Sequence, residues 1–361
     1  MRLIPIMLIL AGVLALAAAQ PAAADPTLPP GTIGPQDYPP DVNPLTGLPA
    51  EDPSFITERR PLLVKVSNAP EIVRPQSGLP HADLVFEHYA EGGWTRFTAL
   101  YWSQGADRIG SVRSVRLIDL QLAPAFDALV VFSGGSNGVI DTIRAAPIYP
   151  FNVISPQFGY GEPYFRRLPR EGLPFEHTMF TDTADLWRWV EEQQVRTQTN
   201  HSRPGWAFHP VPPPGGVPAA GVLVDYIRTD AEWRYDPTVG QYLRWTDGIP
   251  HTDAVNGQQL AFENIIVMTA YHELVLLFEE KYFGEEDSWL IDLIGGGPVT
   301  LYRDGLAYDG RWVREAEGDL ITFVDAQGDP LLLKPGRTFL QVTSGPPGLY
   351  GEAPEPVITL P

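Results

Sequence analysis

Three arginines occur within the nine residues of RIGSVRSVR, which covers residues 108–116. Guanidinium groups form forked hydrogen bonds with carboxylates and phosphates, so a group of them can hold an anion. Between residues 92 and 123 four arginines and two aspartates give a local charge of +2, whereas the whole chain has a formal net charge of −19. The stretch is therefore a basic region on an acidic protein, and an anion is expected opposite it.

The arginines lie where a strand is expected to lead into a helix. Ser111 or Ser114 has the residue type of a helix N-cap, which would place Arg113 and Arg116 near the first turn. Cations at that end oppose the helix dipole by about 0.3–1 kcal/mol each, so helix stability alone does not favour them there.

Two kinds of partner can neutralise these charges. One is the protein's own acids, of which Glu87, Glu91 and Glu162 are candidates. The other is a ligand that carries phosphate or carboxylate groups. The sequence leaves both open.

A hairpin is predicted in ADLVFEHYAEGGWTRFTALYW, residues 82–102, with a two-residue turn at Gly92 and Gly93. This register would pair Glu91 with Trp94, Tyr89 with Arg96, and Glu87 with Thr98. Both glutamates would then share a face with Arg96 and orient its guanidinium group.

Two further segments are expected to line the cleft that holds these arginines. FSGGSNG, residues 132–138, joins a strand to a helix, and its Gly134, Gly135 and Ser136 would let a ligand approach the backbone. It matches neither G-x-G-x-x-G nor a phosphate loop with lysine, so we interpret it as a site-lining loop. His177, in PFEHTMF, follows the basic and aromatic loop YFRRLPR.

Catalytic and metal-binding patterns are weaker. Residues four apart on a strand are separated by roughly 13 Å, beyond the ~5–9.5 Å between glycosidase carboxyls, so Glu87 and Glu91 do not fit that pair. Ser133 and Ser136 lack the G-x-S-x-G elbow. His251 with Asp253, and His272 with Glu273, lack a third ligand, so neither a metal nor another cofactor is expected.

Residues 1–24 are predicted to be a secretory signal peptide, because an apolar run follows Arg2 and ends in small residues. The protein is then secreted or associated with the cell envelope, with an uncleaved signal segment as its only expected contact with a membrane. The chain has no cysteine, which excludes disulfides, thiolate metal sites and a lipidated N-terminal cysteine. Its acidity argues against nucleic-acid partners.

The remaining chain is predicted to have an α+β fold with two domains. A Pro-rich linker over 25–58 is expected to be an extended tether, and strands alternating with helices indicate an N-terminal α/β domain with a mixed sheet over 59–208. A Pro/Gly linker over 209–221 precedes ten strand-length segments, which indicate a mostly antiparallel β domain over 222–345. Residues 346–361 form a Pro-rich tail.

A set of ordered motifs resembles the YerB-like family of exported bacterial proteins. They are NPLTG (43–47), RPLLVKVSNAP with RPQSGL (60–79), ADLVFEHYAEGGWTRF (82–97), IGSVRSVR (109–116), GGS (134–136), YDPTVGQYLRWTDGIPHTD (235–253), NIIV (264–267) and PGRTFLQV (335–342). The resemblance implies an α/β domain followed by a β domain, an extracytoplasmic location, an unassigned general function, and association with cell-wall assembly proteins. Family members are often lipoproteins, and this chain lacks the cysteine. The resemblance supplies no catalytic residues; its matching polar positions are Glu87, Glu91, Arg96, Arg113, Arg116 and His177.

The expected function is therefore non-catalytic binding of an anionic wall component or a wall-assembly protein, with a ten-residue site: Glu87, Glu91, Arg96, Arg113, Ser114, Arg116, Gly134, Gly135, Ser136 and His177. The alternative is an enzyme, a cell-wall glycan hydrolase or a transferase of phosphate-linked glycan. In it Arg96, Arg113 and Arg116 would clamp a pyrophosphate, and Glu87 or His177 would be the acid or base.

Overall fold

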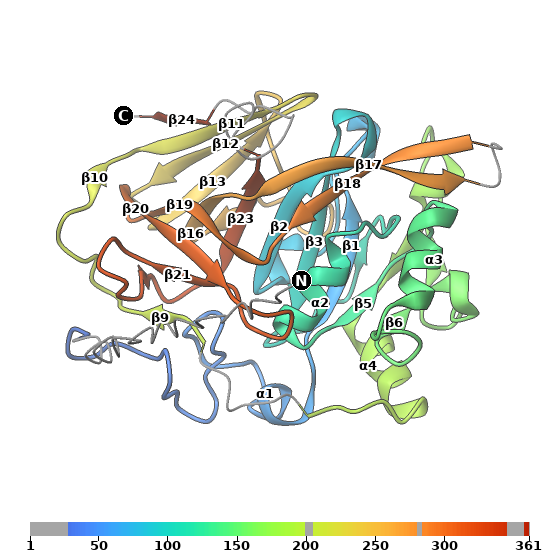
Figure 1. Cartoon of the computed structure of the whole chain (residues 1–361), viewed down its shortest axis with the longest axis horizontal. Coiled ribbons are helices and arrows are strands. Elements are labelled where there is room, and N and C mark those ends of the chain that lie inside the picture. The colour runs from blue at the N-terminus through green and yellow to red at the C-terminus, as the bar shows by residue number, and fades with distance from the viewer. Residues whose placement is uncertain (1–27, 199–204, 280–283, 345–356, 361) are drawn as a thin grey trace, which may run out of the picture.

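The computed structural model describes residues 28–198, 205–279, 284–344 and 357–360 (Figure 1). The predicted signal peptide and most of the predicted tail lie outside these ranges. Within them, no helix is both long and apolar enough to cross a membrane.

The largest sheet of the described chain contains eleven strands and takes strands from both halves of the sequence. In spatial order these are β10 (Val217–Pro218), β20 (Leu306–Arg314), β19 (Gly295–Arg303), β16 (Asn264–Thr269), β23 (Thr338–Thr343), β2 (Leu84–Tyr89), β3 (Thr95–Tyr101), β1 (Leu62–Ser67), β5 (Leu129–Val131) and β6 (Val153–Ile154), with β21 (Thr322–Val324) beside β20.

The two halves meet where β2 and β23 pair in parallel, from Leu84 opposite Thr338 to Glu87 opposite Gln341. In Figure 1 the red strand β23 lies beside the cyan β2 at the centre of the molecule. The N-terminal part of the sheet is mixed, because β1 is antiparallel to β3 and parallel to β5. The halves therefore share one continuous sheet.

The other sheets belong mainly to the C-terminal half. A six-stranded antiparallel sheet contains β14 (Ile249–Pro250), β13 (Gln241–Thr246), β12 (Thr229–Asp236), β11 (Gly221–Tyr226), β24 (Val357–Leu360) and, beside β13, β15 (Ala261–Phe262). Smaller pairings join β17 (Tyr271–Glu279) to β18 (Gly284–Asp292), β9 (Ala207–Phe208) to β22 (Leu332–Leu333), and β4 (Ile109–Gly110) through β8 (Met179–Thr181) to β7 (Arg166–Arg167).

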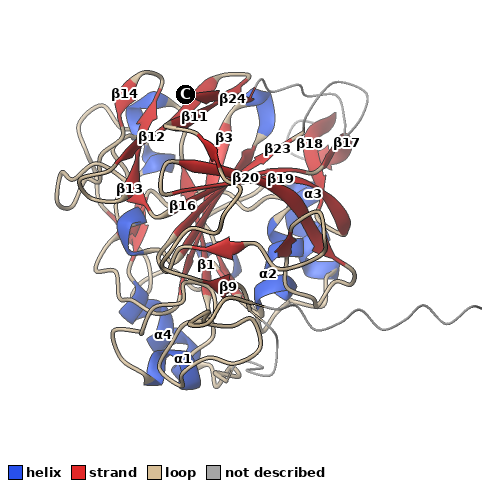
Figure 2. Cartoon of the chain, turned by 90° about the vertical axis from the view of Figure 1, so that its left-hand side faces the viewer, coloured by secondary structure: helices blue, strands red, loops and turns tan. Residues whose placement is uncertain are grey.

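The α-helices of the described chain all lie before residue 193 in the sequence, and Figure 2 shows the helices in blue. They are α1 (Ser54–Glu58), α2 (Asp119–Phe126), α3 (Asn137–Ala145) and α4 (Thr183–Glu192). The side chain of Asp182 caps α4 by accepting a hydrogen bond from the Asp185 amide at 2.7 Å. The predicted α+β fold, with an N-terminal α/β part and a mostly antiparallel β part, is confirmed.

Burial follows the sequence patterns. All six residues of β1, LLVKVS, are buried, as is typical of a strand covered on both faces. In β12 burial alternates, and Thr229, Ala231 and Trp233 point into the core. Each of the ten strand-length segments predicted after Gly221 contains a strand.

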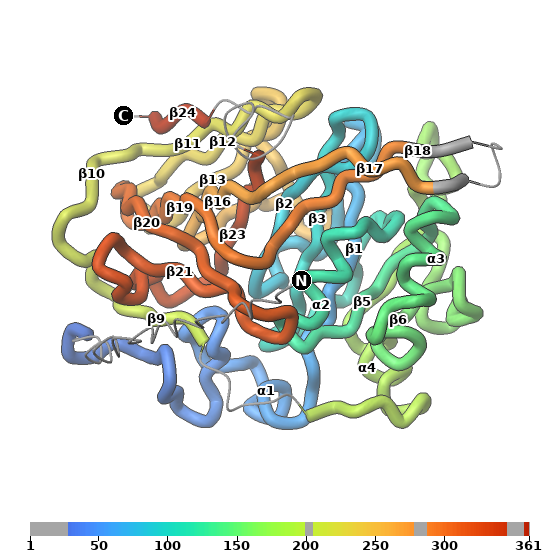
Figure 3. Tube along the Cα trace, in the orientation of Figure 1, coloured from blue at the N-terminus to red at the C-terminus, as the bar shows by residue number. Residues whose placement is uncertain are grey.

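The linker predicted over 25–58 is wrong as an extended tether. From residue 28 onward it packs on the body: Val42, Leu45 and Ile56 are buried, and the Ile33 amide donates to the Phe208 carbonyl at 2.9 Å. Figure 3 shows this blue segment running along the lower side of the molecule in that view. The linker predicted over 209–221 contributes β10 to an edge of the large sheet. Apolar residues among the prolines supply the contacts.

Candidate functional site

The arginine-rich stretch is extended, so the predicted helix start at Ser111 or Ser114 is wrong. The Ser67 amide donates to the Ser111 carbonyl, and the Arg113 amide donates to the Lys65 carbonyl, each at 2.9 Å. β5 pairs only with Leu62–Val64 of β1, so this stretch satisfies the backbone of the rest of β1. Helix α2 begins at Asp119, beyond the arginines.

A small pocket brings the predicted cations together. Arg96, at the start of β3, and Arg113 line a cavity of about 170 Å³ with Glu91, Trp94 and His177. Arg116, which is 8% exposed, forms an ion pair with Glu91. Arg96, Arg113 and Arg116, with Glu91, Trp94 and His177, are called the basic pocket below.

Most hydrogen-bond partners of these arginines are backbone carbonyls. Arg96 Nη1 donates to Ser114 O at 3.2 Å, and Arg113 Nη1 donates to Glu176 O at 2.9 Å. The buried Nε atoms of Arg113 and Arg116 have no hydrogen-bond partner in the described chain. Carbonyls orient the guanidinium groups without cancelling their charge, so donor capacity remains for an anion.

The electrostatics of the pocket are those of crowded cations. Burial, followed by the charge of Arg116, holds the pKa of Arg96 well below its ordinary value, and Glu91 opposes that shift. Burial and Arg116 also lower the pKa of Arg113, against the opposing effect of Glu176. An anion bound between these groups would relieve their mutual repulsion.

The glycine-rich loop lies against the same arginine segment. The Ser133 amide donates to Arg113 O at 3.0 Å, and the Val115 amide donates to Gly134 O at 3.1 Å. Gly134 has φ of +90°, and a side chain at Gly135 would meet Ile140 within 2.9 Å. The loop therefore needs glycine and keeps the backbone close to Arg113.

Two predicted serines lie in this region. Ser114 accepts from Arg96 through its carbonyl oxygen. Ser136 precedes α3 as its N-cap residue, and its buried Oγ has no hydrogen-bond partner in the described chain. Ser114, Gly134, Gly135 and Ser136 thus lie in or beside the arginine segment, but none of them lines the basic pocket, so the prediction that they line the same site is wrong.

His177 is 4% exposed and lines the basic pocket. Burial, and then the charge of Arg113, lowers its pKa to about 4. The imidazole is therefore neutral near neutral pH, and its buried Nδ1 has no partner in the described chain.

The predicted hairpin register is wrong by one residue. His88 pairs with Arg96 and Glu87 with Phe97, because a turn over Glu91–Gly93 replaces the two-residue turn. Residues opposite one another share a face, so Glu87 and Arg96 lie on opposite faces of the sheet. Glu87 does not orient Arg96.

Glu87 instead joins the two halves of the protein. Its Oε2 lies 2.8 Å from Arg244 Nη2, and both side chains are 0% exposed. Asn68 and Thr95 donate to its Oε1 at 3.0 and 2.7 Å. This geometry leaves no open position for a ligand or for acid–base chemistry at Glu87.

Other candidates also separate from the basic pocket. Arg108 Nη2 donates a hydrogen bond to Ala254 O at 3.3 Å, away from the basic pocket. His251 is buried and bonded to Gln76 Oε1 at 2.6 Å. Within the described ranges, no group of three metal-ligating residues could hold a metal ion.

Sequence analysis missed a buried polar network beside the pocket. Lys65 Nζ lies 2.9 Å from Asp119 Oδ1 and 2.6 Å from His88 Nε2. Asp119 Oδ2 also accepts from the Arg116 amide at 2.8 Å, which links the network to the arginines. Burial lowers the pKa of Lys65 to about 8. A lysine inside the apolar run LLVKVS was the available signal.

Comparisons with known proteins agree with this architecture. Residues 45–196 match the family model described as "Protein of unknown function (DUF3048) N-terminal domain", and residues 222–340 match that of the corresponding C-terminal domain. The "Putative lipoprotein YerB" of Bacillus subtilis (strain 168) is 30% identical over 305 residues, which cover 83% of this chain and 85% of the relative. The crystal structure of YerB from Bacillus subtilis superposes with a TM-score of 0.68 at 29% identity, covering 84% of this chain and 97% of that one.

Proposed function

The chain belongs to the YerB-like DUF3048 family, and we propose from its own geometry that it binds an anionic group in the basic pocket without catalysing a reaction. The natural ligand would be a cell-wall component, or a wall-assembly protein, that presents a phosphate or carboxylate. Arg113 and Arg96 would hold the anion directly, and Arg116 would add to the positive electrostatic potential in the pocket.

One observation carries this proposal. Arg96 and Arg113 line one pocket, Arg116 pairs with Glu91 beside them, and Glu91 supplies the only carboxylate among the described lining residues. Glu91 already pairs with Arg116, which leaves Arg96 and Arg113 bonded to carbonyl oxygens. A partly buried cluster of this kind is stabilised when an anion enters.

The size of the pocket limits what it holds. A cavity of about 170 Å³ accommodates one anionic group, so the rest of a larger ligand would lie outside it. The half-buried Trp94 lines the pocket and offers an aromatic surface for that part.

A cell-envelope location supports this kind of ligand. The Bacillus subtilis relative is named a lipoprotein, and the apolar N-terminal segment of this chain has the pattern of a secretory signal. We propose that this chain, which has no cysteine to carry a lipid, also acts outside the cytoplasm.

The test is calorimetric titration with sulfate, pyrophosphate and soluble muropeptides. Arg113→Ala should weaken binding about 10–100-fold, the value of one charge-assisted hydrogen bond. The matched control is Arg144→Ala, which removes the same charge from an arginine whose side chain is 52% exposed on α3 and should change binding less than about twofold. Unchanged binding by a folded Arg113→Ala protein would overturn the proposal.

The enzymatic alternative has less support. Glu87 is sealed in an ion pair, so His177 is the remaining predicted acid or base. A neutral imidazole with a pKa of about 4 could accept a proton but would not donate one near neutral pH. Turnover of a phosphate-linked glycan that is lost in His177→Gln would favour this alternative.

A further inference from the structure

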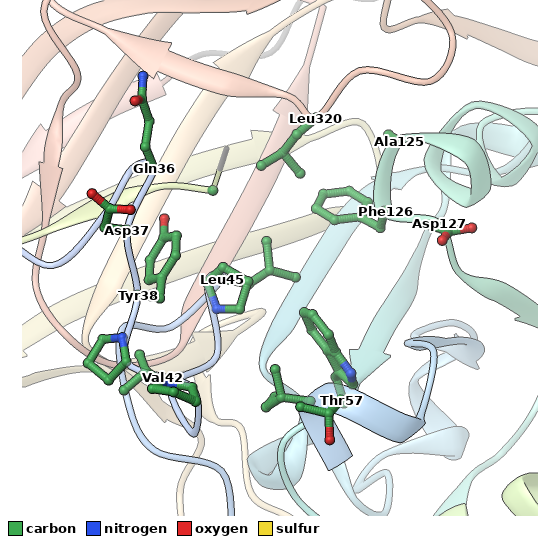
Figure 4. Close-up of a pocket in the computed structure, with 16 residues that line it drawn as sticks. Gln36, Asp37, Tyr38, Val42, Leu45, Thr57, Ala125, Phe126, Asp127 and Leu320 are labelled. Carbon is green, nitrogen blue, oxygen red and sulfur yellow. The ribbon is translucent and has the colours of Figure 1, made fainter. Parts of the chain in front are cut away.

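A second cavity, of about 320 Å³, lies beyond the other end of β3 from the basic pocket. Trp102, which follows β3, forms part of its wall, and Phe126 comes from the end of α2. Figure 4 shows side chains from these elements, from α1 and from the N-terminal segment around one space. From this cavity we propose a binding site for the alkyl chain of an uncharged or cationic amphiphile.

The lining is predominantly apolar. It includes six apolar side chains that are at most 6% exposed: Val42, Leu45, Ile56, Trp102, Ala125 and Phe126. Pro39, Pro40 and Pro44 supply a further wall without amide donors. The volume and composition are those of a site for a small apolar group.

The polar atoms of the aromatic lining residues are already bonded within the protein. Trp102 Nε1 donates to Arg59 O at 2.9 Å, and the Tyr38 hydroxyl donates to Trp206 O. Their rings therefore present carbon surfaces to the cavity, and a ligand with many polar groups would lose its hydrogen bonds to water.

The charged lining groups decide which head group is tolerated. Among the described lining residues they are two carboxylates, Asp37 and Asp127, with no lysine or arginine. Asp127 is held by Arg60 at 3.2 Å and also by Arg196, whereas Asp37 is exposed. A carboxylate head would find no cation among the described lining residues, while an ammonium head could pair with Asp37.

The cavity does not depend on the proposed anion site. The two sites differ in charge, and none of their lining residues is shared. A negative result for anion binding therefore does not bear on alkyl-chain binding, and the reverse also holds.

The experiment compares octylamine, octanol and octanoate by calorimetry on the purified chain. We expect octylamine to bind at least as tightly as octanol, and octanoate at least about tenfold more weakly than either. Asp37→Asn should remove any preference for the amine over the alcohol. Equal or tighter binding of octanoate would overturn the assigned head-group chemistry.

Two variants locate the binding in the cavity. Ala125→Leu fills it from α2, and Thr57→Trp covers it from the exposed side of α1. Each should weaken octanol binding about tenfold or more, whereas Ala145→Leu, a matched change at an exposed position of α3, should not. Thermal unfolding shows whether each variant is folded. If Ala125→Leu does not fold, the comparison uses Thr57→Trp. Octanol binding that is absent, or equal in folded filling and control variants, refutes the site.

Discussion

Replacing Glu87 by glutamine tests whether this residue holds the two halves together or serves the basic pocket. The change keeps the shape and one acceptor oxygen but removes the charge that faces Arg244 at 2.8 Å. Because both side chains are fully buried, Arg244 would keep an uncompensated charge away from water.

The cost can be bounded from the surroundings of Arg244. Removing one partner of a buried pair costs about 3–5 kcal/mol. The guanidinium carbon lies 5.4, 5.1 and 4.9 Å from the ring centres of Phe97, Trp233 and Phe339, and these rings offset part of the loss. Asn68 and Thr95 retain a carbonyl acceptor in the variant. We therefore expect a loss of about 3 kcal/mol in the free energy of unfolding.

Urea unfolding followed by circular dichroism measures this loss. The double variant Glu87→Gln with Arg244→Met should recover most of it, since neither charge then remains buried alone. Sulfate binding by the folded Glu87→Gln protein should stay within about twofold of the original. A loss below about 1 kcal/mol, or a clear change in sulfate affinity, would refute the structural role assigned to Glu87.

Three further predictions concern the basic pocket and its neighbours. Glu91→Gln removes the carboxylate that competes for Arg116 and should raise sulfate affinity severalfold in calorimetry; unchanged or weaker binding contradicts this. His177 stays neutral above its pKa of about 4, so sulfate affinity should be flat between about pH 5.5 and pH 8; a rise toward low pH contradicts it. Because burial lowers the pKa of Lys65 from 10.5 to about 8, the unfolded chain binds more protons between those values, and stability should rise with pH there by about 3 kcal/mol. Urea unfolding at several pH values should show a smaller rise for Lys65→Met.

Local patterns predicted most of the elements. The strand-length segments after Gly221 all contain strands, because β-branched and aromatic residues there alternate between recognisable turns. Apolar residues recur at helical spacing over 137–146 and 182–195, and these segments contain α3 and α4. The segment 114–123 has helical spacing throughout, yet α2 starts only at Asp119. The chain up to Arg113 pairs with β1, and the Val115 amide then donates to Gly134 O.

The sequence does not predict which strands pair when they lie far apart along the chain. Nothing in β2 indicates that its neighbour is β23, more than 200 residues later, so the sequence predicts the two domains but not the sheet that continues from one into the other. Glu87 illustrates the consequence. Its partner Arg244 belongs to the other half. Neighbours in the sequence suggest Arg96 as the partner of Glu87 instead, because Arg96 follows in the same hairpin.

The one-residue error in the hairpin strengthens the case for an external anion. With the observed register, Arg96 shares a face with His88, and the alternation of β1 and β3 places Lys65 on that face as well. The same shift moves Glu87 to the opposite face, where Arg244 neutralises it. On the face that carries Arg96, Asp119 is already bonded to Lys65, so fewer internal acids remain for the arginines than the sequence alone suggested. This geometry supports the proposed binding of an anion from outside the chain.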